Sequence, residues 1–461
     1  MIRPPRQTRR ARLRRIGTLG IAAALGLGAR GLGGCASADA NPSADANPSA
    51  VRSGAEGDDE ALPRLDGQRI TLLTGWSKRE REAFAPVIAR FEQRTGARVK
   101  LTDADERITA KVYHAVDASN LPDVALIRQP GLLGELVANQ ALTPLDDKTR
   151  DRVARHTAPS WRALATVDGT EYGVWFAGST SSQLWYPDAG GAAPGTGDWS
   201  AFLRALRDRP ASDAPAISVG AKSGWPVGDW FENLYLGEAG AEQYERLSRH
   251  EIPWTDPSVA RALDRLAELR RTPGALQPDT ADESFGDSLD AVFGSPRLAE
   301  RVLSGGSAVP ESAAAAPFPS PATEPGASII GGTVAVQLKP SDGGAVLLRY
   351  LAGAEAAELW IAVGGISPHN DADLSSAPNE AARAANELVR PGPGGTGSNA
   401  RRFDLSDLAP SGFGAYPDSG AQQILREFFA HPADVHLTQQ RLERAAEAAW
   451  STAPQLAPSG R

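Results

Sequence analysis

The sequence predicts an α/β protein built on mostly parallel β-sheets, and three observations lead to this prediction. From residue 69 onward, apolar strands alternate with amphipathic helices at a spacing of about 30 residues. The chain has 461 residues, of which 41% are hydrophobic and 23% charged, so it is long enough for two or three domains with full-sized cores. Helical patterns dominate its second half, which we therefore expect to be rich in helices.

Three strands are predicted in the first half, at residues 69–74, 98–102 and 124–127. Each precedes a helix whose apolar residues recur at helical spacing: Phe84, Val87, Ile88 and Phe91, then Ile108, Val112 and Val116, then Leu132, Leu133, Leu136 and Val137. This order implies a parallel sheet with right-handed crossovers. Ligands of such sheets bind beyond the carboxyl ends of the strands. Residues 75–80, Asp103, Arg128 and Gln129 follow those ends.

In the second half, the spacing of apolar residues predicts seven further helices, at residues 199–207, 229–247, 257–271, 345–360, 379–389, 421–429 and 436–450. Residues 304–327 are rich in proline, alanine and serine, and we expect them to run over the surface or between parts of the fold.

The first 34 residues are predicted to be a lipoprotein signal peptide. Eight arginines lie in residues 1–30, around an apolar run at residues 16–29 that is too short to cross a bilayer. The next residues, Leu32, Gly33, Gly34 and Cys35, resemble a bacterial lipobox, in which the cysteine is lipidated. Both the general and the twin-arginine export routes stay open, as does an accidental cysteine.

Residues 35–66 contain the repeat SADANP and almost no large apolar side chain. Such a stretch cannot bury enough surface to offset its ordering entropy, so it predicts a disordered tether. A doubly acylated cysteine would then anchor the folded part at the outer face of the cytoplasmic membrane.

Charge and composition exclude several functions. The net charge is -8, and removing the eight leader arginines leaves 40 basic against 56 acidic residues, a net of -16, which disfavours nucleic acid as a partner. One cysteine and scattered histidines predict no metal site. Neither GxGxxG nor GxxxxGK[ST] follows a strand, so we expect no nucleotide cofactor.

Short strings in order over residues 69–450 resemble the family 1 extracellular solute-binding proteins of carbohydrate ABC importers, in particular the alpha-glucoside-binding type. They include Thr74-Gly75-Trp76, Leu121-Pro122-Asp123-Val124, Gln129-Pro130-Gly131-Leu132-Leu133, Tyr172-Gly173-Val174, Gly224-Trp225-Pro226, Asp229-Trp230-Phe231-Glu232, Pro253-Trp254-Thr255-Asp256-Pro257, Gly364-Gly365-Ile366-Ser367-Pro368 and Arg402-Phe403-Asp404-Leu405. At residues 291–297, where many members carry a stacking tryptophan, this chain has none.

The resemblance implies a two-lobed periplasmic-binding-protein-like fold of type II, each lobe a mostly parallel sheet flanked by helices. We expect the first lobe at residues 67–178 and 328–375, and the second, helix-rich lobe at 179–327 and 376–461. The implied function is capture of a sugar, such as an alpha-glucoside, and its delivery to an ABC permease. The protein would be a monomer and no enzyme, so no catalytic residue is predicted.

A pyranose presents an apolar face and a rim of hydroxyls, which suit flat aromatic rings and planar polar groups. Trp76, Trp175, Trp225 and Trp230 lie in or beside Gly- or Pro-marked turns and are the aromatic candidates, with core packing as the alternative for each. Trp161, Trp254, Trp360 and Trp450 are expected in the core.

The polar candidates from the first lobe are Glu80, Asp103, Arg128 and Gln129. Glu80 could instead stabilise a helix start, and Asp103 could cap the next helix. By the resemblance, Gly332 and Thr333 lie on a segment that crosses between lobes, and Arg402 reaches the cleft from the second lobe. Asp404 and Asp407 are expected to staple that loop.

Three alternatives stay open. The same fold could bind a non-sugar solute such as a polyol or a peptide. A secreted lipoprotein glycosidase would also use carboxylates and aromatic rings, although no catalytic motif is recognisable. A sensor or adhesin would bind without transport.

Overall fold

In a computed structural model of the chain, the structure describes residues 61–104, 108–118, 120–188, 198–209, 215–277, 280–321, 326–414, 420–432 and 434–452. The predicted signal peptide, the lipidation site Cys35 and most of the predicted tether lie outside these residues.

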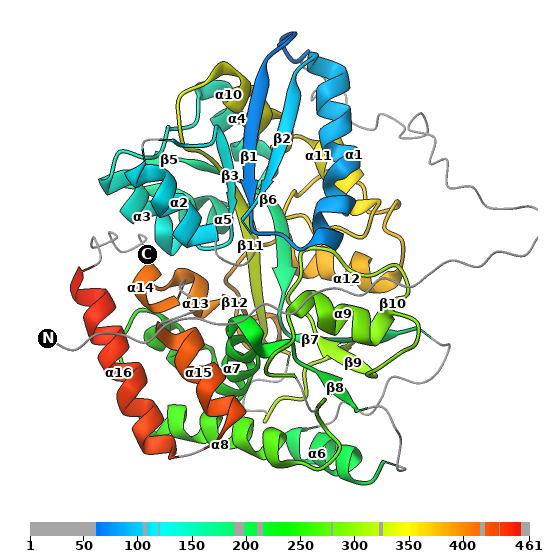
Figure 1. The fold of residues 1–461 in the computed structure, drawn as a ribbon, viewed down its shortest axis with the longest axis vertical. Coiled ribbons are helices and arrows are strands. Elements are labelled where there is room, and N and C mark those ends of the chain that lie inside the picture. The colour runs from blue at the N-terminus through cyan, green and yellow to red at the C-terminus, as the bar shows by residue number, and fades with distance from the viewer. Residues whose placement is uncertain are drawn as a thin grey trace, which may run out of the picture. The chain divides into compact units, whose positions relative to one another are not determined.

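The first sheet has six strands within the described ranges, and it forms the upper part of Figure 1. They are β1 (Arg69–Thr74), β2 (Arg98–Asp103), β3 (Val124–Ile127), β6 (Gly173–Thr180), β11 (Ser328–Gln337) and β12 (Arg401–Phe403). β1 pairs in parallel with β2 and β3, as predicted, whereas the long strand β11 runs antiparallel to β3 and β6 and parallel to β12. The fold class inferred from the sequence is confirmed.

Side chains alternate between the two faces of this sheet because strand residues point to opposite sides in turn. Leu72 and Leu126 pack under α1 (Lys78–Thr95), α10 (Asp342–Leu351) and α11 (Ala354–Ile361). Leu73 and Ile127 pack under α2 (Ile108–Asp117) and α3 (Gly131–Ala138) on the other face. Helices on both faces leave the strand ends as the part of the sheet that is open to a ligand.

The first sheet also carries smaller elements at its margins. These are α4 (Asp147–His156), α5 (Pro159–Leu164), the hairpin β4 (Thr166–Val167) and β5 (Thr170–Glu171), and α12 (Glu380–Val389). α12 packs against β6.

The second sheet has the order β10-β7-β9-β8. Its strands are β7 (Gln183–Pro187), β8 (Ile217–Ser218), β9 (Arg301–Leu303) and β10 (Ala313–Pro317). Only β8 and β9 pair in parallel among these described strands; β7 is antiparallel to both neighbours, so this sheet is mixed rather than mostly parallel.

Helices outnumber strands in this second part, as predicted. They are α6 (Trp199–Arg207), η2 (Ala221–Ser223), α7 (Trp225–Ser248), α8 (Pro257–Arg271), α9 (Phe285–Phe293), α13 (Leu405–Leu408), α14 (Ser411–Gly414), α15 (Gly420–Ala430) and α16 (Val435–Thr452); the short helix η3 (Gly397–Asn399) precedes β12 of the first sheet. Their core includes Trp230, Phe231 and Trp254, which are almost fully buried.

The chain passes between the two sheets where β6 leads into β7 and where β10 leads into β11, close to the predicted crossings (Figure 1). The third crossing comes later than predicted. α12 packs against β6, and β12 pairs with β11, so residues 380–403 belong with the first sheet and not with the second lobe. Local patterns could not place them, since the assignment depends on pairing with distant strands.

Two further segments differ from expectation. The predicted tether ends before residue 61, because Leu62 and Leu65 are buried in the core beside α1. Residues 304–310 are buried and 313–317 form β10, so the first part of the Pro/Ala/Ser segment supplies a strand rather than a surface loop, and the segment ends where the chain passes between the two sheets, which was the second alternative. Small alanine side chains fit against β7 despite their weak strand propensity.

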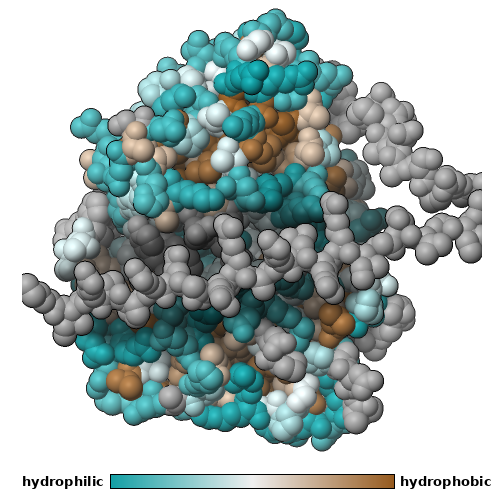
Figure 2. Space-filling view, in the orientation of Figure 1, coloured by the Kyte–Doolittle hydropathy of each residue, from teal (hydrophilic) through white to brown (hydrophobic). Residues whose placement is uncertain are grey.

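None of the helices in the described ranges is long and apolar enough to cross a bilayer. Figure 2 shows a mainly hydrophilic surface on the visible face. Among the described residues, the large apolar side chains that are exposed are Leu298, Val363 and Leu437.

Candidate functional site

A cavity of about 1070 Å³ lies at the carboxyl ends of β1, β2 and β3, as the strand order predicted. Its other wall comes from the second part of the fold. The lining comprises residues 75–82, Asp103, Ile108, Leu126, Arg128 and Gln129 on the first side, and Lys222, Ser223, Trp225, residues 284–287, Leu289, Asp290, Asp404, Ser406, Asp407 and Gln422 on the second. This volume suits a ligand of several rings.

Arg128 is the central polar group of the cavity. It follows β3, and one guanidinium nitrogen donates a hydrogen bond to the carbonyl oxygen of Gly305, 3.1 Å away. The guanidinium carbon lies 5.1 Å from the ring centroid of Trp225, which is within the range of a cation–π contact. Gly305 must be glycine here, because a Cβ would come within 2.7 Å of the Trp225 ring and 2.9 Å of Asp229 Oδ2.

Four buried or nearly buried carboxylates surround Arg128: Glu80, Asp229, Asp404 and Asp407. Burial by itself would lower the pKa of Arg128, but these negative charges together raise it above the usual arginine value. The guanidinium is therefore held charged, with its orientation set by the backbone of Gly305 and the ring of Trp225.

Burial raises the pKa of Asp229 and of Asp407 well above the ordinary aspartate value. The negative charge of Asp404 adds to this rise, and the positive charge of Arg128 opposes it. The Oδ2 atoms of Asp229 and Asp407 are buried without a hydrogen-bond partner among the described residues. Asp407 borders the cavity, although its Oδ2 atom is itself covered by protein.

Asp404 and Glu232 hold this arrangement in place. Asp404 Oδ1 accepts from Ser406 Oγ at 2.7 Å and from the Asp407 backbone N at 3.0 Å, so it caps α13. Glu232 accepts from the backbone N of Leu405 at 2.8 Å. The expectation that Asp404 staples this loop is confirmed, whereas Asp407 faces the cavity.

Glu80 borders the cavity but is already fully engaged. Its Oε2 accepts from Ser77 N at 2.9 Å and from Ser77 Oγ at 2.8 Å in a capping box, and its Oε1 accepts from Ser307 N at 3.0 Å. The alternative role at a helix start is the observed one. The bond to Ser307 also joins the first sheet's α1 to the segment after β9.

Asp103 and Gln129 lie at the cavity wall as predicted. Asp103 forms an ion pair of 2.9 Å with Arg81 of α1. The alternative that it caps the next helix involves residues 105–107, which lie outside the described ranges. Gln129 Oε1 accepts from Thr109 Oγ1 at 2.5 Å.

Trp225 is the tryptophan that the structure places at the cavity with an exposed part. It begins α7, directly after Gly224, and its ring lies 4.8 Å from that of Phe285. Phe285 is the first residue of α9 and shortly precedes residues 291–297, where many members of the resembled family carry a stacking tryptophan. Trp225 and Phe285 thus supply the aromatic surface of the second wall.

The other three tryptophan candidates pack in the core. Trp76 touches the cavity but is only 2% exposed, because its ring stacks on Trp360 at 5.3 Å. Trp175 packs against Trp161 and Phe403, and Trp230 against Phe318, and neither lines the cavity. The structure therefore favours the core-packing alternative for Trp175 and Trp230, because local turn signals do not fix which way a ring points.

Gly332, Thr333 and Arg402 also lie away from the cavity. A Cβ at Gly332 would come 2.8 Å from the carbonyl oxygen of Ala177, so glycine serves strand packing there rather than ligand approach. Thr333 Oγ1 accepts from Trp76 Nε1 at 3.3 Å. Arg402 forms an ion pair of 2.8 Å with Glu245 and fastens β12 to α7.

Several cavity residues were not predicted: Arg81, Lys222, Phe285, Asp287, Asp290, Asp407 and Gln422. The serine at residue 284 followed three residues later by Asp287 is a helix-start signal that could have placed Phe285 at the amino end of α9. No local sequence pattern predicts that α9 lies at the same cavity as the end of β3.

The raised pKa of Asp407 predicts how the folding stability of the protein depends on pH. A carboxyl whose pKa is higher in the folded than in the unfolded chain costs stability as pH rises from the unfolded value, about 4, through the folded value. Asp407→Asn removes this cost, so we expect the variant to melt above the wild type at pH 7 and to match it near pH 4. Thermal unfolding between pH 4 and pH 8 measures the difference.

Asp290→Asn is the matched control, since Asp290 lies at the same cavity but is largely exposed. It should leave the pH dependence of melting unchanged. A constant difference between Asp407→Asn and the wild type at all pH values would contradict the prediction.

The arrangement of two sheets joined by crossing strands, with a polar and aromatic cavity between them, defines the class: this is the fold of a two-lobed solute receptor. Solved structures support the fold. The receptor AcbH, described as preferring β-D-galactopyranose, superposes with a TM-score of 0.69 at 17% identity over 83% of this chain and 99% of its own. The GacH receptor of Streptomyces glaucescens, solved with acarbose, gives 0.61 at 16% identity over 85% and 100%.

Two curated relatives extend the comparison to the sequence level. The alpha-glucosides-binding periplasmic protein AglE of Rhizobium meliloti is 28% identical over 385 residues, 76% of this chain and 82% of AglE. The osmoprotective compounds-binding protein GgtB of Synechocystis is 27% identical over 383 residues, 78% of this chain and 88% of GgtB. No protein-family model matches the chain.

The resemblance to the family 1 extracellular solute-binding proteins of carbohydrate importers, predicted from the sequence motifs, is confirmed by these relatives. Both relatives are named as binding proteins and not as enzymes, in agreement with the prediction that this chain is not an enzyme.

Proposed function

We propose that this protein binds a sugar outside the cytoplasm and delivers it to an ABC permease, with an alpha-glucoside as the leading ligand class. The observation that carries the proposal is the cavity, in which Arg128, Asp407 and the ring of Trp225 face a common space. Planar charged groups can pair with adjacent hydroxyls while an aromatic ring covers the apolar face of a pyranose. The names of AglE and of the structural neighbours support the same class.

Binding is expected to be coupled to closure of the two lobes. The lobes already meet through Arg128 with Gly305, Glu80 with Ser307, and Arg79 with Asp290 at 3.0 Å. A ligand that touches both walls binds the closed form more tightly and shifts the population towards it. The closed form would then dock on the permease, and the receptor would act as a monomer.

The test is a titration of the purified protein with mono-, di- and oligosaccharides, including maltose and trehalose. A ligand raises the melting temperature in proportion to its occupancy and changes the fluorescence of Trp225. Release of reducing sugar with time would instead indicate a glycosidase. No response to any sugar would contradict the proposal.

A second candidate ligand class follows from GgtB, whose name specifies osmoprotective compounds. A polyol presents the same vicinal hydroxyls to Arg128 and Asp407 but has no flat ring for Trp225. A response to polyols that survives Trp225→Ala, together with no response to sugars, would favour this class.

We also propose that Cys35 is lipidated and that residues 36–60 connect the folded part to this membrane anchor. Cys35→Ala should move the protein from the membrane fraction to the medium, because two acyl chains provide stable attachment and none remains in the variant. Cell fractionation with immunoblotting measures the shift. Retention of Cys35→Ala in the membrane fraction would argue against the anchor.

A further inference from the structure

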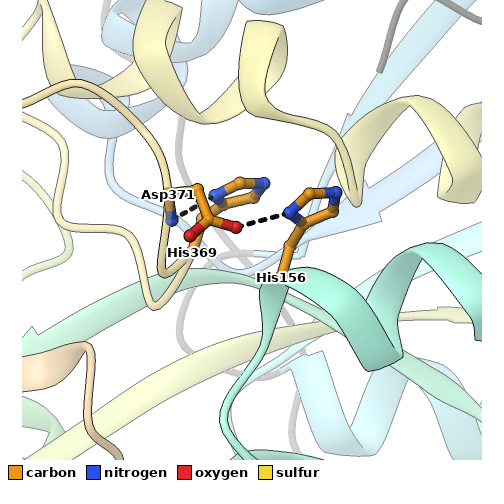
Figure 3. Close-up of side chains that lie close together, drawn as sticks. All are labelled: His156, His369 and Asp371. Carbon is orange, nitrogen blue, oxygen red and sulfur yellow. Dashed lines mark hydrogen bonds and ion pairs between the residues drawn. The ribbon is translucent and has the colours of Figure 1, made fainter. Parts of the chain in front are cut away.

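Two histidines and an aspartate meet on the first lobe, away from the cavity (Figure 3). His156 is the last residue of α4, and His369 and Asp371 lie in the segment that follows α11. A ligand atom from each of the three side chains lies within 4.8 Å of the others. The proposed function gives this cluster no role.

The backbone fixes both histidines. Asn370 N donates to the carbonyl oxygen of His156 at 2.8 Å, and Thr157 and His369 form an antiparallel bridge. The two imidazole rings stack at 4.7 Å with an angle of 14° between their planes. His369 is buried and the His156 side chain is only 14% exposed, so neither ring is free to leave the cluster. The donors are therefore preorganised.

The side chains present nitrogen and oxygen atoms to one another. His156 Nδ1 lies 2.7 Å from Asp371 Oδ2, and His369 Nδ1 accepts a hydrogen bond from Asp371 N at 3.2 Å. Figure 3 shows both Nδ1 atoms on the side that faces Asp371. His369 Nδ1 uses its lone pair to accept this hydrogen bond, so an ion bound at Nδ1 would take the place of the Asp371 N–H donor. Imidazole nitrogen with carboxylate oxygen is a ligand set suited to Zn²⁺ and similar divalent transition metals.

We propose that His156, His369 and Asp371 bind one divalent transition-metal ion, of which Zn²⁺ is the model, with water completing the coordination. Bonds of about 2.0–2.2 Å in a tetrahedron separate ligand atoms by about 3.3–3.6 Å. To bind the ion, the distance between His156 Nδ1 and Asp371 Oδ2 must increase slightly, and the longer distances among the three ligand atoms must decrease. The Asp371 side chain is 62% exposed, so its carboxylate can adjust its distance to each ring, while any contraction between the two rings requires the end of α4 or the segment after α11 to shift.

The ion replaces the proton shared by His156 Nδ1 and Asp371 Oδ2. In a neutral imidazole that proton can move to Nε2, whereas a doubly protonated ring must release one proton to solvent.

We expect the bound ion to stabilise the first lobe. The ion would join the end of α4 to the segment after α11, two parts of the chain that are more than 200 residues apart in sequence. That segment also contacts β6, where Ser367 Oγ lies 3.4 Å from the carbonyl oxygen of Phe176. None of the three ligands lines the cavity, so sugar affinity should stay unchanged.

The experiment uses the untagged mature protein after treatment with a chelator and desalting. Calorimetric titration with Zn²⁺ should give one ion per chain, and Zn²⁺ should raise the melting temperature by about 3 °C or more, while Mg²⁺ should not. Co²⁺ should give visible absorption bands of a nitrogen and oxygen site.

His156→Gln and Asp371→Asn keep the size of each side chain and should each weaken Zn²⁺ binding at least tenfold. His436→Gln, at an exposed histidine of α16, is the control and should bind as the wild type does. No stoichiometric binding at about 1 mM Zn²⁺, or unchanged binding by the double variant His156→Gln/Asp371→Asn, would overturn the proposal. Neither result would bear on sugar binding, which is measured separately.

Discussion

Trp230→Ala is expected to destabilise the protein by about 3–5 kcal/mol, because it empties a tryptophan-sized space in a closed core. Trp230 is 0% exposed and lies among the helices of the second lobe, with its ring 5.3 Å from that of Phe318. Denaturant unfolding of the ligand-free protein measures this loss. At temperatures where the variant remains folded, its sugar affinity should be close to that of the wild type.

Trp225→Ala is the matched comparison, since this ring lies only five residues earlier on the same helix. It is partly exposed at the cavity, so its removal should lower sugar affinity about tenfold or more and cost less stability than Trp230→Ala. Calorimetry and unfolding on both variants separate the two effects. Equal stability losses with equal affinities would contradict the assignment of Trp225 to the site.

Arg128→Met is expected to abolish most ligand binding and also to destabilise the free protein. Methionine keeps the length of the side chain but removes the charge that offsets Asp229, Asp404 and Asp407. Breaking a fully buried pair costs about 3–5 kcal/mol; Arg128 is partly open to the cavity, so we expect about 2–3 kcal/mol. Loss of its charged hydrogen bonds should weaken sugar binding about 10- to 100-fold.

A double variant tests the electrostatic reason. Asp407→Asn in the background of Arg128→Met should restore part of the lost stability, because one of the uncompensated carboxylates is gone. Arg79→Met, which removes an exposed ion pair with Asp290 at the same cavity, should change stability by less than about 1 kcal/mol. If Arg128→Met melted as the wild type does, the carboxylates would not depend on this arginine.

The sequence predicted the first sheet well. Residues 69–74, 98–102 and 124–127 are strands, and Arg128 and Gln129 lie at the cavity, because the periodicity of neighbouring side chains fixes strands and helices and their order fixes a parallel sheet. The strands β6 and β11 were not predicted. They are buried on both faces, so their residues do not alternate between apolar and polar, and their pairing partners lie far away in sequence.

By itself, the sequence determined the α/β class, the end of the sheet at which the cavity lies, and the family resemblance carried by ordered motifs. Only the tertiary structure decided which side chains reach the cavity. Trp175 turns into the core because Trp161 and Phe403 cover it, and Arg402 is held by Glu245. Asp407 faces Arg128 because α13 and β3, almost 300 residues apart, meet in the fold. A side chain's direction depends on what packs against it, and those neighbours come from distant parts of the chain.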